Sequence, residues 1–99
     1  MPFTNEQKKA YRTIGHSLKP IVSVAGKGLT GSVLEELERA LNDHELIKIK
    51  IAVGDRESRK QVLDDMLQAT GSELVQQIGN MALILRKNPN AKAKLSNLS

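Results

Sequence analysis

The sequence predicts an α/β fold of the two-layer, α+β-like type, with the element order αβαβαββ and a four-stranded mixed sheet. Three segments repeat apolar residues at intervals of three and four, as amphipathic helices do. Other short segments are β-branched or alternate between apolar and polar residues, as strands do. Helices between strands imply right-handed crossovers with parallel pairing, whereas the last two strands are close enough in sequence to form an antiparallel hairpin.

The first helix is expected from about Asn5 to His16. Thr4 and Gln7 have the spacing of a capping box, in which each side chain accepts a hydrogen bond from the other residue's backbone N–H. The residues on its apolar face are Tyr11, Ile14 and Leu18. Pro20 ends the helix because proline disfavours the helical conformation in the residue before it. The β-branched run 21–24 then predicts the first strand.

The second helix follows a glycine-rich turn. Its apolar stripe consists of Val33, Leu34, Leu37, Ala40 and Leu41. Either Thr30 or Ser32 is suited to be its N-cap, and the helical pattern ends near Asp43-His44. The opposite side of this helix is acidic and therefore faces water.

The second strand, Leu46–Val53, alternates strictly. Its isoleucines face one way, and Lys48 and Lys50 face the other, which predicts one buried face and one wet, basic face. Asp55 is suited to cap a third helix that ends at Gly71, and Gly79-Asn80 predicts a hairpin with a type I′ or II′ turn. We expect a single domain over residues 1–87 and a mobile, basic tail over residues 88–99.

Composition excludes several classes of protein. The chain has no cysteine, so a disulfide framework and a thiolate metal site are excluded. It has no apolar run of about eighteen residues and no apolar N-terminal signal core, so we expect a cytoplasmic protein with no membrane partner. The net charge is +4, with cations gathered in the first thirty residues and after residue 85 and an acidic block at 31–45. This separation predicts a basic surface that suits a polyanion such as nucleic acid.

The sequence offers no arrangement of residues that supports catalysis. His16 and His44 lie at expected helix ends and have no second ligand at metal spacing. The adjacent acids at 35–36 and 64–65 cannot face each other on a helix. The glycines at positions 26, 28 and 31 match the letters of a dinucleotide motif, but no acid on a second strand supports it. We therefore expect no enzyme activity, no metal or cofactor and no small-molecule substrate.

The glycine-rich turn is the strongest candidate for contact with a ligand. A strand that leads through glycines into a helix N-terminus presents free backbone N–H groups and the positive end of the helix dipole. Glycines leave room for a phosphate group, and Lys27 adds a positive charge. The simpler interpretation is that glycine only provides the positive φ that a tight turn requires.

Two segments, HSLKPIVSVAGKGLTGSVLEELERAL and HELIKIKIA, resemble the CRM domain family of YhbY-like RNA-binding domains, most closely its single-domain bacterial members. The resemblance covers about Thr4 to Lys87. The matching motifs, in the family's order and spacing, are His16, Leu18-Lys19-Pro20, Gly28-Leu29-Thr30 and Leu46-Ile47-Lys48. The resemblance implies a fold similar to the C-terminal domain of translation initiation factor three. It also implies association with precursors of the large ribosomal subunit.

The family is similar to KH domains in placing a Gly-x-x-Gly loop against the RNA backbone. Two registers are possible here, Gly28–Gly31 by letters or Ala25–Gly28 by alignment, and we favour the second, in which alanine replaces the first glycine. The RNA-binding residues that the family match implies are Lys19, Gly26, Lys27, Gly28 and Lys48. Lys50 and Arg86 are added from the strand pattern alone, as positions expected on the same face of the sheet.

The sequence thus predicts a monomeric RNA-binding protein that acts on large-subunit ribosomal RNA during pre-50S assembly. Its aromatic residues are one Phe and one Tyr, so we expect contacts to phosphate and RNA shape rather than base stacking. The alternative is a protein-interaction module that docks a basic ribosomal protein on the acidic side of the second helix. That side carries Glu35, Glu36, Glu38 and Asp43.

Overall fold

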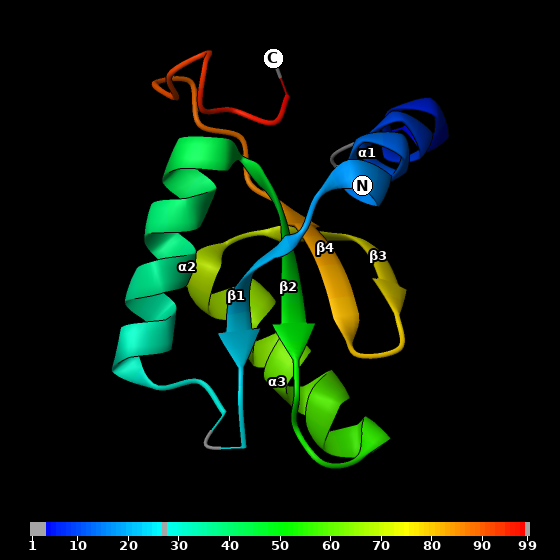
Figure 1. Ribbon diagram of the computed structural model, residues 1–99, viewed down its shortest axis with the longest axis vertical. Helices are drawn as coiled ribbons and strands as arrows, with labels where there is room; N and C mark the ends of the chain where they lie inside the picture. The colour runs from blue at the N-terminus through cyan, green and yellow to red at the C-terminus, as the bar shows by residue number, and fades with distance from the viewer. Residues whose placement is uncertain (1–3, 27, 99) are drawn as a thin grey trace.

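The computed structural model describes residues 4–26 and 28–98, and within them it confirms the predicted order of three helices and four strands (Figure 1). The elements are α1 (Asn5–Ser17), β1 (Pro20–Val24), α2 (Gly31–His44), β2 (Leu46–Ile51), α3 (Arg56–Thr70), β3 (Glu73–Ile78) and β4 (Met81–Leu85). The strands form a mixed sheet in the order β1-β2-β4-β3. As the crossover rule predicts, β1 and β2 are parallel, and β4 is antiparallel to both of its neighbours.

The ends of the elements follow the predicted capping signals. Thr4 and Gln7 form the capping box of α1. Thr30, and not Ser32, caps α2, and Asp55 caps α3. In the β3–β4 turn, Gly79 has a positive φ and Asn80 does not, which is the pattern of a type II′ turn. The strand β2 ends at Ile51, two residues earlier than its alternation suggests.

The main core lies between the sheet and the helices α2 and α3. Its members from the sheet include the isoleucines of β2, which the alternation predicted to be buried. They pack against Leu37 and Leu41 of α2 and against Leu63 and Met66 of α3, all nearly inaccessible to water. Burial of each such side chain contributes about 1.5–3 kcal/mol to folding.

A second, smaller cluster lies on the other face of the sheet. Leu46, Val75, Leu83 and Leu85 are buried there beneath Tyr11, Ile14 and Leu18, which come from α1 and the residue after it. The helix α1 therefore covers one part of this face and adds a partial third layer to the predicted two. The rest of the face stays open, and the wet side of β2 lies there, with Lys48 half-buried and Lys50 exposed.

Gly15 allows α1 to lie directly on the sheet. The residue is buried. A β-carbon at this position would overlap Cδ2 of Leu83 and would lie only 3.0 Å from Cδ1 of the same side chain. The absence of a side chain thus sets how closely α1 approaches β4. A single glycine in a helical sequence pattern gives no indication of such a contact, because its partner is almost seventy residues away.

The sequence predicts a mobile tail after residue 87. In the structure, residues 88–98 return to the C-terminal end of α2 (Figure 1). The backbone N–H of Asn97 donates to the His44 carbonyl at 2.9 Å, and its Nδ2 donates to the Leu46 carbonyl at 2.6 Å. Ser96 Oγ donates to Glu45 Oε1 at 2.7 Å, and Leu98 packs against the second cluster. The residues of this segment show no apolar periodicity, so no pattern in the sequence indicates these contacts.

Candidate nucleic-acid interface

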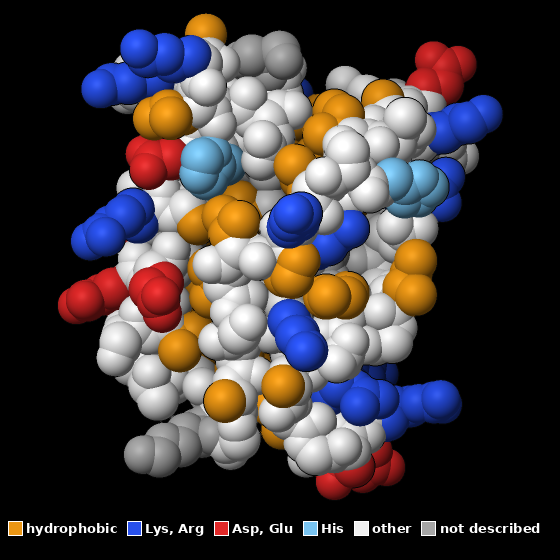
Figure 2. Space-filling model, viewed as in Figure 1, with side chains coloured by type: hydrophobic (Ala, Val, Ile, Leu, Met, Phe, Trp, Pro, Cys, Tyr) orange, Lys and Arg blue, Asp and Glu red, His pale blue; other side chains and the backbone are white. Residues whose placement is uncertain are grey.

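Three of the predicted cations lie together on the open face of the sheet. Lys48 and Lys50 share that face because side chains alternate along β2. Lys19 precedes Pro20, which is paired with Lys48, and Lys19 and Lys48 line one shallow hollow of about 170 Å³. Figure 2 shows Lys and Arg side chains over the centre of the sheet, with hydrophobic side chains beside them. The structure thus brings together residues that are about thirty positions apart in the chain.

The glycine turn begins at the end of this face. Ser23 is paired with Lys50, and the turn starts two residues later at Ala25. At about 3.3 Å per residue, β1 is roughly 15 Å long, and the lysines lie along this length. The face and the turn therefore form one continuous surface along β1 and β2, which we call the basic column; it comprises Lys19, Lys48, Lys50 and the turn residues Gly26 and Gly28.

The conformations of Ala25 and Gly31 agree with the alignment-based register. The Gly28 N–H donates to the Ala25 carbonyl at 2.9 Å and closes a four-residue turn. Gly28 has φ +72°, which explains a glycine there, whereas Ala25 has no positive φ and tolerates its side chain. Gly31 is the first residue of α2 and belongs to the helix. Lys27 lies outside the described residues.

Gly26 has a different physical role from Gly28. Its φ is not positive, and a β-carbon built on it would meet no atom within 4 Å. Neither the turn conformation nor internal packing therefore requires glycine at this exposed position. A bare backbone at the tip of the turn leaves room for an external group such as a phosphate.

Arg86 is not on the same face as Lys48 and Lys50, and the predicted placement is wrong. Its guanidinium lies on the helical side of the sheet, where it donates to Glu38 Oε2 and to the Thr70 carbonyl, both at 2.8 Å, and to Asn42 Oδ1 at 2.9 Å. The strand β4 is apolar on both faces, so its sequence did not indicate the direction of the residue that follows it. Arg86 joins α2 to the end of α3.

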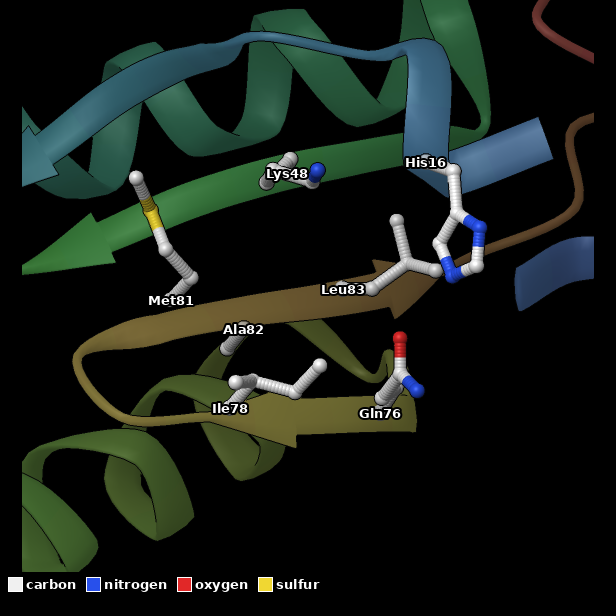
Figure 3. Close-up of a pocket in the computed structure, with 7 residues that line it drawn as sticks. All are labelled: His16, Lys48, Gln76, Ile78, Met81, Ala82 and Leu83. Atoms are coloured by element: carbon white, nitrogen blue, oxygen red, sulfur yellow. The ribbon is translucent and has the colours of Figure 1, made fainter. Parts of the chain in front are cut away.

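A second hollow on the open face lies beside Lys48 (Figure 3). We call it the central hollow; it has a volume of about 220 Å³. Met81, Ala82 and Leu83 of β4 line its middle, Lys48 borders it on the β2 side, and Gln76 and Ile78 border it on the β3 side. His16 of α1 and the amide of Gln76 lie at one end of it (Figure 3).

A second group of cations, on α3, is not among the residues predicted from the sequence. Arg56, Arg59 and Lys60 of α3 line a hollow of about 390 Å³ with Leu74, Gln77 and Gly79 from β3 and its hairpin. Their spacing of three and four residues places them on one helix face, which is the signal that could have found them. The net acidity of residues 55–85 concealed this local cluster.

The histidines lie in the last turns of α1 and α2, as predicted. His44 Nδ1 lies 2.6 Å from the Leu95 carbonyl and therefore binds the C-terminal segment.

Asp55 caps the N-terminus of α3, and its carboxylate accepts hydrogen bonds from Ser58. These hydrogen bonds lower the pKa of Asp55 below the ordinary 3.8. No group of three side chains that could hold a metal ion occurs among the residues that the structure describes. In the described segments, no helix has both the length and the apolar character needed to span a membrane.

The fold and this surface define a small mixed α/β domain that presents a strip of lysines and a glycine turn on one open sheet face. The model of the CRS1 / YhbY (CRM) domain matches residues 3–86, and the chain belongs to this family.

Similar proteins are found in several bacteria. The chain is 56% identical over 99 residues to Probable RNA-binding protein PA4753 of Pseudomonas aeruginosa, an alignment that covers 100% of this chain and 95% of the relative. It is 39% identical over 92 residues to a protein of Haemophilus influenzae named RNA-binding protein, with 93% of each chain covered. The solution structure of protein SAV1595 from Staphylococcus aureus is similar with a TM-score of 0.77 at 30% identity, covering 91% of this chain and 94% of that one.

Proposed function

We propose that this protein binds RNA through the basic column. The observation that carries the proposal is the placement of Lys19, Lys48 and Lys50 on one uncovered sheet face that leads into the glycine turn. Exposed lysines contact phosphates, and a bare turn at a helix N-terminus adds backbone N–H donors to the same path. Family membership and the RNA-binding names of two similar proteins support the same class of ligand.

Within this class, we propose ribosomal RNA of the large subunit, in its precursor particle, as the partner. This step rests on the family resemblance carried by the motifs at Leu18-Lys19-Pro20 and Gly28-Leu29-Thr30. Crosslinking in cells followed by sequencing of the bound RNA tests it. Enrichment of the large-subunit precursor is expected, whereas enrichment of messenger RNA or an intron would replace that partner within the same binding mode.

The binding surface is tested by reversing two of its charges. Lys48→Glu combined with Lys50→Glu should weaken binding to a single-stranded oligouridylate by about tenfold or more, since two phosphate contacts become repulsive. The control is Lys92→Glu with Lys94→Glu, which changes the net charge equally on the C-terminal segment. Equal losses in both variants would show that general charge, and not the basic column, carries the binding.

The acidic side of α2 is the alternative binding surface, and one of its four carboxylates is already paired within the protein. Glu38 is engaged by Arg86, so Glu35, Glu36 and Asp43 remain for a basic protein partner. A pull-down that retains ribosomal proteins after complete nuclease digestion would favour this surface. Loss of those proteins with the RNA would support the basic column.

A further inference from the structure

The central hollow combines an apolar lining with charged and polar borders. Ile78 is 64% exposed beside it, and Met81 is half-buried. Lys48 borders it directly, and Lys50 is paired with Met81 on the adjacent strand. An apolar hollow bordered by cations does not suit a phosphate, because a phosphate needs hydrogen-bond donors at the centre of its site. It suits a flat apolar ring that is linked to phosphate groups, since the ring can fill the hollow while the phosphates contact the cations beside it.

We propose that the central hollow holds one unpaired base of the bound RNA, an inference that rests on the proposed function. At about 220 Å³ the hollow is smaller than the roughly 300–1,000 Å³ typical of pockets for drug-sized ligands, so it suits one base and not two. The Met81 thioether is a polarisable surface on which an aromatic ring packs favourably. The aliphatic side chains of Ile78 and Leu83 complete an apolar support for the base.

The end of the hollow at α1 supplies the groups that would contact the edge of the base. The His16 ring and the Gln76 amide lie together there, and each can both donate and accept a hydrogen bond (Figure 3). The same two residues also line a neighbouring hollow with Lys9 and Arg12. Cations therefore lie on both sides of the central hollow, where the phosphates before and after an inserted base would be.

The proposal predicts that bases, and not only phosphates, contribute to affinity. We would compare oligouridylate and oligoadenylate of about twelve nucleotides with an abasic ribose-phosphate chain of the same length at fixed salt. At least one base-containing chain should bind about tenfold more tightly than the abasic chain, as expected for one packed base. Ile78→Ser should abolish this difference and leave binding of the abasic chain unchanged, because it alters no charge.

Leu95→Ser is the control, since Leu95 is also an exposed aliphatic residue but lies on the C-terminal segment and lines neither the central hollow nor the hollow at Lys19. Its preference for base-containing chains should equal that of the unchanged protein. Equal binding of abasic and base-containing chains to the unchanged protein would overturn the proposal and leave the proposed RNA binding intact. A loss of protein partners by Ile78→Ser, with both RNA affinities unchanged, would assign the hollow to a protein and also overturn it.

A second measurement separates the hollow from RNA binding as a whole. Nucleoside monophosphates should shift the methyl NMR signals of Ile78 and Met81 at millimolar concentration, and ribose 5-phosphate should not. Shifts with the nucleotides in a protein that fails to bind any RNA chain would preserve the base site while refuting the proposed function. Equal shifts with ribose 5-phosphate would show that the hollow takes a phosphate and would overturn the inference.

Discussion

Gly15 and Gly28 have different physical roles, although both are single glycines in the sequence. Gly28 provides a positive φ for the turn before α2, which is a property of its own backbone. Gly15 has helical backbone angles, and its role is to let α1 approach Leu83 of β4. The first role follows from local sequence. The second depends on a partner that only the folded chain brings near.

Replacing Gly15 with alanine tests this close approach. Alanine favours a helix by about 1 kcal/mol over glycine, but overpacking against the buried Leu83 costs about 1–3 kcal/mol. Gly15→Ala should therefore lower the free energy of unfolding by about 1 kcal/mol, as measured by urea denaturation. In a Leu83→Ala background, the same substitution should become neutral or stabilising. Destabilisation of equal size in both backgrounds would contradict the contact.

Among the elements, α2 is joined to the rest of the molecule by polar contacts near its C-terminal end. Arg86, after β4, binds Glu38 and Asn42 of α2 together with the last carbonyl of α3. Glu45, after α2, has φ +63°, an unfavourable conformation for glutamate, and its carboxylate accepts hydrogen bonds from the Asn88 N–H and Ser96 Oγ. The C-terminal segment thus holds Glu45 in place.

Arg86→Ala should destabilise the protein strongly and affect RNA binding little. Its side chain is only 20% exposed and makes several charge-assisted hydrogen bonds, so its loss should cost about 2–3 kcal/mol in urea denaturation. Lys87→Ala removes the same charge from the exposed neighbouring residue and should change stability by less than about 0.5 kcal/mol. An Arg86→Ala protein of unchanged stability with weakened RNA binding would return Arg86 to the binding surface.

Asn97→Ala tests whether the C-terminal segment is packed in solution. The substitution removes the bond from Nδ2 to the Leu46 carbonyl and should lower the free energy of unfolding by about 1–2 kcal/mol. Asn90→Ala, at an exposed position of the same segment, is the control and should have little effect. If both variants match the unchanged protein, and amide exchange of residues 90–98 is as fast as in an unfolded chain, the segment is mobile as composition predicts.

For the molecule as a whole, the charges are separated by face. The basic column lies on the open side of the sheet, whereas Glu35, Glu36 and Asp43 lie on α2. A net charge of +4 understates this separation, because the acidic residues cancel the lysines in the sum but not in space. Association with a polyanion should therefore be governed by the local charge of the basic column.

Salt dependence measures that local charge. The logarithm of the RNA association constant should fall linearly with the logarithm of salt concentration, because bound phosphates release counterions. Lys48→Ala and Lys50→Ala should each reduce the slope by about one, whereas Arg86→Ala should leave it unchanged. Fluorescence anisotropy with a labelled oligouridylate provides the slopes. A slope that does not respond to Lys48 or Lys50 would exclude phosphate contacts at the sheet face.

Local signals in the chain were sufficient for the element order, the caps at Thr4 and Asp55, the hairpin at Gly79-Asn80 and the two faces of β2. Each depends on residues within a few positions of one another, where backbone preferences and apolar periodicity act directly. The proposed contacts at Lys19, Gly26, Gly28, Lys48 and Lys50 were likewise visible, through a motif and an alternating strand. Their role in RNA binding stays a prediction.

The direction of Arg86, the contact of Gly15 with Leu83, the packing of residues 88–98 and the central hollow depended on tertiary structure. Each joins residues from segments far apart in the chain, and no local preference encodes such a pairing. The strand β4 is apolar on both faces, so alternation could not assign Arg86 to a side until the register with β2 was known. Short-range physics therefore determined the elements and their wet faces, while the packing of α1, β3 and β4 determined which side chains meet.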